Sequence, residues 1–267
     1  MKQLFYFGVE QAKACLFPVI IFMTLAITKM IEVPFINRYD LILFICLVTQ
    51  VLMVIFKLET WDEVKVICVF HLIGLSLEIY KVHMGSWSYP EEAYSKVFGV
   101  PLYSGFMYAS VASYMCQAWR RLDLKLEHFP SSWLVLVLSA GIYFNFYTHH
   151  FIYDFRWILK IATLLIFIRT FVYFSVKDNT YKMPLSLSFL LIGFFIWVAE
   201  NIATFFGAWS YPNQEGHWEI VHIGKISSWF MLVIVSFLIV ALLKHVKENR
   251  KKYVGEKSLY SKRWAEK

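Results

Sequence analysis

The amino-acid sequence predicts an all-α polytopic membrane protein, a bundle of about eight transmembrane helices. Of its 267 residues, 59% are hydrophobic and 17% are Asp, Glu, Lys or Arg, whereas a typical soluble domain carries about 25% charged residues. A soluble domain of this length could not bury so much apolar surface in one core. The charged residues are also clustered, which leaves long apolar stretches between them. This composition excludes disordered, collagen-like and coiled-coil proteins.

A transmembrane helix needs about 20 mostly apolar residues, and eight stretches of the chain meet that requirement. In chain order, the predicted spans are residues 14–31, 40–57, 64–83, 100–119, 132–150, 155–176, 184–206 and 221–243. Only a short polar cluster around His149, His150 and Asp154 separates the fifth stretch from the sixth. We expect a tight hairpin there, because one helix over 132–176 would be longer than the bilayer is thick.

The positive charge of the chain is concentrated at its C-terminal end. Residues 244–267 hold nine Lys or Arg and three Glu, a net charge of +6, whereas residues 1–243 have a net charge of +1. The loops on the side of the N-terminus also hold more Lys and Arg than the opposite loops, which predicts that both termini are cytoplasmic. We therefore expect one transmembrane domain, 1–243, and a basic cytoplasmic tail, 244–267, near anionic lipid headgroups. No folded basic module accompanies the tail, so we predict no nucleic-acid partner.

Two segments that lie 122 residues apart have similar sequences. Residues 78–90 read EIYKVHMGSWSYP and residues 200–212 read ENIATFFGAWSYP, with six of thirteen positions identical. Each copy ends the third helix of a predicted four-helix half, 1–125 or 126–243. An even number of helices in each half makes the two halves parallel and places both copies on the outer face. Parallel repeats commonly bind a ligand between the halves.

Glu78 and Glu200 occupy equivalent positions, seven residues before the glycine of each repeated segment. An acidic side chain inside a membrane helix costs free energy and normally faces the bundle interior or a water-filled cavity. Two such acids at one cavity would form a catalytic general acid/base pair or a cation site. The alternative is structural: Glu78 pairs with Lys81 three residues later, and Glu200 bonds to neighbouring helices.

The repeated Gly-x-Trp-x-Tyr-Pro segment has two interpretations. In the structural one, Gly lets the backbone leave the helix, Pro prevents a new helix, and Trp and Tyr lie at the headgroup level. In the functional one, Trp87, Tyr89, Trp209 and Tyr211 line the mouth of a cavity. Their rings then stack on a conjugated ligand or stabilise a cation.

Three histidines and one aspartate complete the predicted ligand-binding site. His71 lies seven residues before Glu78 and therefore on the same helix face, while His150, Asp154 and His222 are expected near the outer surface. The alternative is that these histidines bond to water or headgroups at the interface. The sequence contains neither H-E-x-x-H nor paired C-x-x-C motifs, so we predict no metal. No cofactor is assigned by any motif.

Over its whole length, the chain resembles a bacterial multi-pass membrane family known as domain of unknown function 817, which implies the bacterial plasma membrane. Residues 78–102 also resemble integral-membrane carotenoid-modifying proteins, the small lycopene cyclases and carotenoid hydratase relatives. The shared features are an acid, the G-x-aromatic-x-aromatic segment and a V-P-L stretch. The cyclases carry adjacent glutamates after that proline, whereas Tyr103 and Ser104 follow Pro101 and Leu102 here. This departure argues against cyclisation.

Three functions are consistent with these patterns. The first is binding or modification of a lipophilic, isoprenoid-like molecule by acid/base chemistry, which begins with protonation of a C=C bond. The second is transport of a small solute, coupled to protons, and the third is a non-catalytic membrane scaffold. A long apolar slot with both glutamates at one end would favour the first function. A polar path across the bilayer would favour the second, and no cavity near either glutamate the third.

Overall fold

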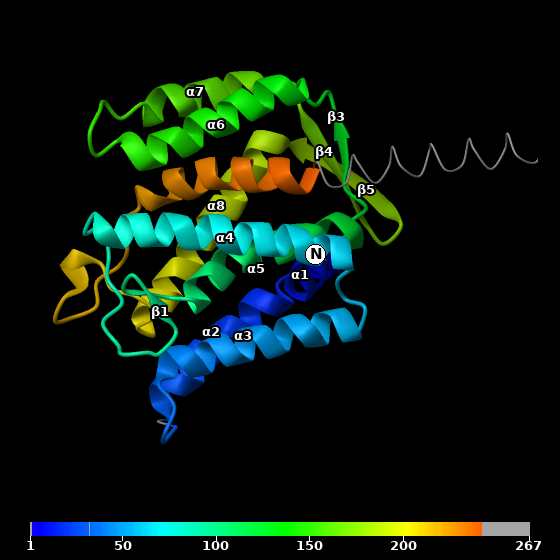
Figure 1. Cartoon of the computed structure of the whole chain (residues 1–267). Coiled ribbons are helices and arrows are strands. Elements are labelled where there is room, and N and C mark those ends of the chain that lie inside the picture. The colour runs from blue at the N-terminus through cyan, green and yellow to red at the C-terminus, as the bar shows by residue number, and fades with distance from the viewer. Residues whose placement is uncertain (1, 32, 242–267) are drawn as a thin grey trace, which may run out of the picture.

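Helices form most of the protein in the computed structural model, which describes residues 2–31 and 33–241. Most of their axes run along one common direction (Figure 1). In chain order the helices are α1 (Lys2–Ala14), α2 (Leu16–Met30), α3 (Arg38–Ile55), α4 (Trp61–His83), α5 (Tyr103–Arg121), α6 (Ser132–Thr148), α7 (Arg156–Ile166), α8 (Leu185–Phe205) and a last helix over Lys225–Ala241. A short 3-10 helix covers Pro212–Gln214. The predicted basic tail, 244–267, lies outside the described residues.

The chain is a helical membrane protein with three or four candidate spans among the described residues. By length and composition, α3, α4 and α8 can each cross a bilayer. The fourth candidate joins α1 and α2, which bend by 69° at their junction. The helix α6 and the last helix are apolar but shorter. The predicted number of about eight membrane spans is therefore larger than the three or four spans that the described helices support.

The prediction of one membrane helix over 155–176 is wrong. The helix α7 ends at Ile166, and the residues that follow form strand β4 (Phe171–Val176). Its sequence FVYFSV is rich in aromatic and β-branched residues, which favour a strand. β4 pairs antiparallel with β3 (Lys125–Glu127) and with β5 (Asn179–Pro184). A second antiparallel pair joins β1 (Lys96–Val97) to β2 (Val100–Pro101), so the fold is not purely α-helical.

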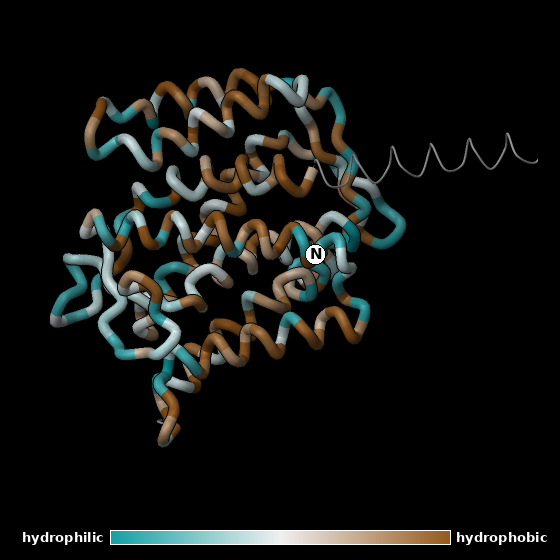
Figure 2. The backbone as a smooth tube through the Cα atoms, in the orientation of Figure 1, coloured by the Kyte–Doolittle hydropathy of each residue, from teal (hydrophilic) through white to brown (hydrophobic). Residues whose placement is uncertain are grey.

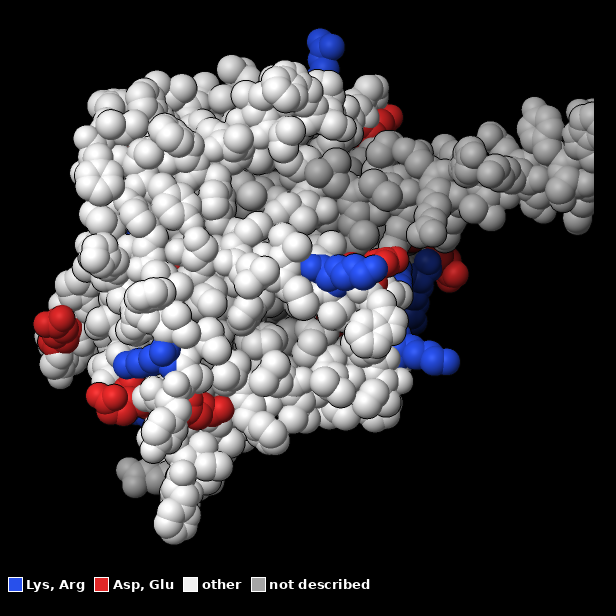
Figure 3. All heavy atoms as spheres, viewed as in Figure 1, with Lys and Arg blue, Asp and Glu red and all other residues white. Residues whose placement is uncertain are grey.

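Apolar and charged residues are separated along the helix direction. In Figure 2 the hydrophobic segments run along the helices, while the hydrophilic ones gather in the end loops. Figure 3 shows charged side chains near the two ends of one face, with a broad, almost uncharged surface between them. Large apolar side chains such as Phe44, Phe195 and Leu165 are exposed. An exposed apolar surface of this kind fits a lipid environment.

The two repeated segments end their helices in the same way. α4 begins with a capping box between Thr60 and Glu63 and ends before Gly85, which has φ 68°. α8 ends before Gly207, which has φ 70°. Glycine adopts this left-handed conformation without the steric cost that a Cβ adds. Beyond the glycines, Ser88 and Ser210 form an isolated antiparallel bridge, with N–H to O distances of 2.9 and 3.0 Å.

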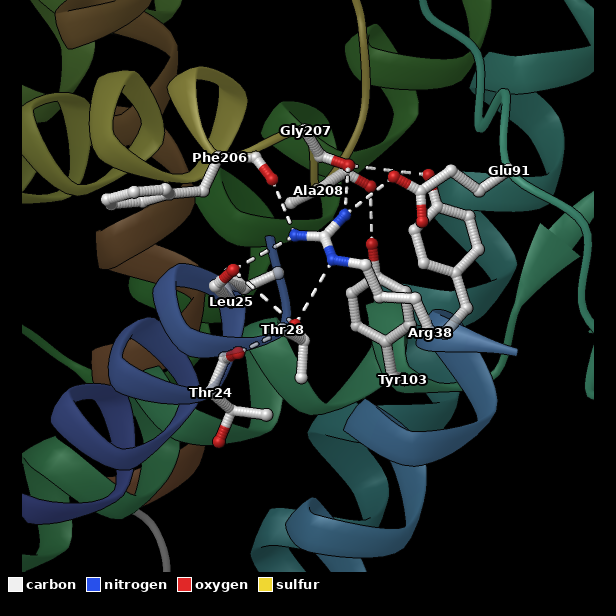
Figure 4. Close-up of polar contacts among 10 residues, drawn as sticks. Thr24, Leu25, Thr28, Arg38, Glu91, Tyr103, Phe206, Gly207 and Ala208 are labelled. Atoms are coloured by element: carbon white, nitrogen blue, oxygen red, sulfur yellow. Dashed lines mark hydrogen bonds and ion pairs between the residues drawn. The ribbon is translucent and has the colours of Figure 1, made fainter. Parts of the chain in front are cut away.

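Arg38, at the start of α3, connects three separate segments through its guanidinium group (Figure 4). It satisfies carbonyl oxygens that the ends of helices leave without intrahelical partners. Its acceptors are the backbone oxygens of Phe206, Gly207 and Leu25 and the Thr28 hydroxyl, and it forms an ion pair with Glu91 at 2.7 Å. Arg38 therefore holds the end of α8 against α2 and α3.

Candidate functional site

A large cavity of about 1110 Å³ lies between the helices. Ligand pockets usually measure about 300–1,000 Å³, so the volume of this cavity lies just above the upper end of that range. Its lining includes residues of α8 from Leu185 to Ala203. This stretch corresponds to about 27 Å at 1.5 Å per residue. The cavity is therefore elongated along the helix direction.

The cavity reaches the apolar outer surface of the bundle. Leu4 of α1, Val19 of α2 and Phe195 of α8 all line it, and their side chains are also exposed. In a membrane, this side of the bundle faces lipid chains. The cavity therefore opens on the apolar side of the bundle.

The charged residues that line the cavity in the described part of the chain gather at one end. This is the end at which α4 and α8 finish and α7 and the last helix begin (Figure 1). The charged lining residues are Glu78, Lys81, Arg156, Glu200 and Lys225. Toward the other end, apolar residues such as Leu122, Phe174 and Met183 form the wall.

Glu78 is buried in α4, with 6% of its surface exposed, and accepts three hydrogen bonds. Its Oε2 accepts the Trp87 indole N–H at 2.6 Å and the Tyr89 hydroxyl at 2.7 Å. Its Oε1 accepts the Tyr108 hydroxyl of α5 at 2.7 Å. Buried carboxylates need such donors to replace lost water. The predicted pair between Glu78 and Lys81 does not form; the Lys81 ammonium instead contacts the Nε2 atoms of His149 and His150, at 3.4 and 3.0 Å.

Glu200 is buried to the same degree in α8, with 4% of its surface exposed. Its Oε1 accepts the Tyr211 hydroxyl, and its Oε2 accepts the Trp229 indole N–H at 2.8 Å. Trp229 belongs to the last helix, just as Tyr108 belongs to α5. The donors to each glutamate therefore come from two places, the repeated segment that contains the glutamate and the next long helix along the chain.

These contacts restrict where a proton can lie on each carboxyl group. An indole N–H is only a donor, whereas a phenol hydroxyl both donates and accepts. The Oε2 atoms face the indole N–H groups of Trp87 and Trp229, which cannot accept a proton. The Oε1 atoms face tyrosine hydroxyl groups, which can accept as well as donate a hydrogen bond.

Tyr89 and Tyr211 remain hydroxyl donors at neutral pH. Burial, followed by the charge of Glu78, raises the pKa of Tyr89 well above its usual value. Burial and the charge of Glu200 raise the pKa of Tyr211 in the same way. Ionising either phenol would place two negative charges beside each other in an apolar site.

The structure brings most of the predicted site residues together at the charged end. Six of them line the cavity: Glu78, Glu200, Trp87, Trp209, Tyr211 and His222. Tyr89 and His150 do not line the cavity themselves but contact residues that do, Tyr89 bonding to Glu78 and His150 to Lys81. Asp154 lies behind this wall and pairs with Arg156 at 3.4 Å.

His71 lies apart from this group. Its ring packs against Phe106, with ring centres 4.6 Å apart, and against Gly105 of α5. Its Nδ1 is buried without a hydrogen-bond partner. Among the described residues, no group of three or more His, Cys, Asp or Glu side chains could hold a metal ion.

Comparison with known proteins assigns the family. The family model described as "Protein of unknown function (DUF817)" matches residues 3–237. The chain belongs to DUF817. It is also 64% identical over 249 residues to the "Uncharacterized protein YoaT" of Bacillus subtilis (strain 168), with 93% of this chain and 94% of the relative covered.

Two solved structures show weaker likeness to this DUF817 protein. One is a cross-linked trimer of MvINS, with a TM-score of 0.48 and 14% identity, covering 69% of this chain and 95% of that chain. The other is MvINS itself, a mycobacterial Insig homolog from Mycobacterium vanbaalenii, with a TM-score of 0.47 and 14% identity. It covers 68% of this chain and 93% of that chain.

Sequence reasoning did not identify three residues at the charged end of the cavity. Tyr108 and Trp229 bind the glutamates from neighbouring helices, and Lys225 lines the cavity beside them. Lys225 was visible as a charge at the start of an apolar stretch. Tyr108 and Trp229 carry no such signal, because aromatic residues are frequent throughout this chain.

Proposed function

We propose that this protein binds a lipophilic, isoprenoid-like molecule from the bilayer and modifies it by acid/base chemistry at Glu78 and Glu200. The observation that carries this proposal is the elongated cavity with mainly apolar walls and both glutamates at one end. Its length suits an extended chain of isoprene units. Its contact with the outer apolar surface gives such a chain an entrance.

The layout that we propose for the molecule is two parallel repeats in the bacterial plasma membrane. An offset of 122 residues places α8 on α4 and the last helix on α5. Gly85 and Gly207 have the same left-handed conformation. Ser88 pairs with its own equivalent, Ser210, in an antiparallel bridge. A two-fold axis along the helix direction relates parallel helices and antiparallel extended segments in this way.

The chemistry begins with transfer of the Oε1 proton of one glutamate to a C=C bond of the bound molecule. The π electrons of that bond form the new C–H bond and leave a carbocation on the neighbouring carbon. The faces of Trp87 and Tyr211, whose ring centres are 5.9 Å apart, stabilise such a cation. Loss of a proton to the second carboxylate, or addition of water, then completes the reaction. The local resemblance to carotenoid-modifying proteins supports the same substrate class.

Transport is less well supported by this geometry. A transporter needs polar groups along a path through the membrane. The charged lining residues of the described chain gather at one end of the cavity, and its opposite end is mainly apolar. This distribution favours a bound lipophilic molecule over a solute in transit.

The test is to purify the protein in mild detergent and to identify co-purifying lipids by mass spectrometry. Ala199→Phe narrows the cavity from α8, whereas Leu190→Phe adds the same side chain on the exposed face of that helix. We expect a prenyl lipid with the wild type and with Leu190→Phe, and at least a tenfold loss with Ala199→Phe. Equal lipid content in all three proteins would contradict the proposal.

Glu78→Gln and Glu200→Gln test the acid/base step. Each amide can keep its oxygen toward the indole N–H and donate its NH₂ to the tyrosine hydroxyl, so the hydrogen bonds survive while the titratable proton is lost. We expect both variants to fold and retain the lipid but to lose its conversion by at least a hundredfold, a typical general-acid contribution. Wild-type conversion in both variants would refute the catalytic role.

A further inference from the structure

Lys225 has an unusual environment for a lysine inside an apolar bundle. It is the first residue of the last helix, is partly buried and lines the cavity. Among the described residues, no carboxylate lies within 4.0 Å of its Nζ, so it has no ion pair there. Within the described part of the chain, its Nζ donates one hydrogen bond, to the Tyr211 hydroxyl at 3.1 Å. A lysine in an apolar pocket is a nucleophile when its amine is uncharged.

Two aromatic rings flank this amine. Its Nζ lies 4.3 Å from the ring centre of Tyr211 and 5.1 Å from that of Trp87. These rings come from the two repeated segments, so Lys225 lies where the segments meet. The second lysine at the cavity, Lys81, is engaged with two imidazoles.

Tyr211 also connects the amine to an acid. Its hydroxyl donates to Oε1 of Glu200 and accepts from Lys225. A proton can therefore pass from the ammonium group through the hydroxyl to Oε1 of Glu200. The result is an uncharged amine beside a protonated carboxyl group, the pair that condensation with a carbonyl group requires.

From this arrangement we infer that Lys225 binds a lipophilic aldehyde covalently, as an imine, in the cavity. This inference rests on the proposed lipophilic occupant and names its functional group. The amine lone pair attacks the aldehyde carbon, and one amine proton moves to the oxygen to give a carbinolamine. The nitrogen then forms the C=N bond as the hydroxyl leaves as water, with a proton from Glu200. The step is reversible and involves no oxidation or reduction.

The surroundings also suit the product. A protonated imine carries one positive charge between the faces of Trp87 and Tyr211, which attract a cation. Glu78 and Glu200 line the same end of the cavity and serve as its counter-charges. The donors that bind these two carboxylates in the described chain are uncharged indole and phenol groups, so the carboxylate charges are not already neutralised by a direct ion pair.

The test incubates the purified protein in detergent with retinal, a polyene aldehyde, followed by cyanoborohydride to reduce any imine. Peptide mass spectrometry then maps the label. We expect a red-shifted absorption band before reduction and label on Lys225 after it. Lys225→Arg keeps the positive charge but has no primary amine. We expect this variant to lower both the label on the peptide that contains position 225 and the red-shifted absorption band at least tenfold. Lys160→Arg is the matched control, because Lys160 lies over the Trp157 ring and outside the cavity.

Label spread over exposed lysines, a band that survives Lys225→Arg, or no label on Lys225 in the wild type would each overturn the inference. Quenching of tryptophan fluorescence by retinal reports binding separately from condensation, and should persist in Lys225→Arg. If prenyl lipids still co-purify while Lys225 stays unlabelled, the imine is wrong and the lipophilic occupant stands. If neither occurs, both proposals fail.

Discussion

Glu78 and Glu200 occupy equivalent positions, but their surroundings differ. Glu78 accepts three hydrogen bonds and Glu200 accepts two. In both sites a tyrosine eleven residues later, Tyr89 or Tyr211, donates to the acid. The indole donors do not correspond, because Trp87 comes from the repeated segment and Trp229 from the following helix. The repeat therefore preserves the acid and its tyrosine, while the neighbouring helices make each site distinct.

Removing each acid tests the difference between the two sites directly. Glu78→Ala leaves three buried donors without their acceptor, and Glu200→Ala leaves two. An unsatisfied buried donor costs about 1–3 kcal/mol, partly offset because a buried charge is also removed. We expect Glu78→Ala to lower the free energy of unfolding in detergent by about 1–2 kcal/mol more than Glu200→Ala does. Equal losses would mean that the number of donors does not distinguish the two sites.

A second comparison concerns Arg38 and its equivalent, Lys160. Arg38 binds the carbonyl groups that end α8, whereas Lys160 lies over a tryptophan ring. Arg38→Gln should cost about 2–4 kcal/mol, because it leaves Glu91 and several carbonyl oxygens unpaired. Lys160→Gln should stay within about 0.5 kcal/mol.

Amide hydrogen exchange locates the effect of Arg38. In Arg38→Gln, we expect residues 200–212 to lose more protection than residues 78–90. The same loss in both segments would show that Arg38 stabilises the whole bundle and not the Glu200 side.

The smallest expected difference is between the two glycines. Gly85→Ala and Gly207→Ala each place a Cβ in the left-handed region, at a cost of about 1–2 kcal/mol. A Cβ at Gly85 meets nothing within 4 Å, and one at Gly207 meets the Lys29 ammonium at 3.4 Å, an ordinary contact. Thermal unfolding of the two variants should therefore agree within about 0.5 kcal/mol. A larger gap would show that the two helix ends are held differently.

The repeat led us to expect Glu78 and Glu200 at one cavity, because equivalent positions of two parallel halves would lie at the same depth. Matching Gly, Trp, Tyr and Pro in both copies then indicates the same chain exit. Both acids line one cavity, and the expectation combined the repeat with the number of apolar stretches in each half.

The features that sequence reasoning missed depend on contacts between distant segments. The hydropathy of Phe171–Val176 is the same whether it forms a helix or a strand, and β3 and β5 decide the outcome. In the sequence, Arg38 is one charged residue at the start of a helix. Its partners Phe206 and Gly207 lie 168 and 169 residues away along the chain. Such pairings follow from the folded topology and cannot be obtained from local periodicity.

The bridge between Ser88 and Ser210 has a consequence for ancestry. A residue that pairs with its own equivalent makes the contact that two identical subunits make about a symmetry axis. In such a dimer, every side chain near the axis must appear twice, so an amine beside the acids would face a second amine. Joining the copies in one polypeptide removes that restriction. At the position 122 residues before Lys225 the chain has Tyr103, so the amine that we propose as reactive has no counterpart in the first repeat.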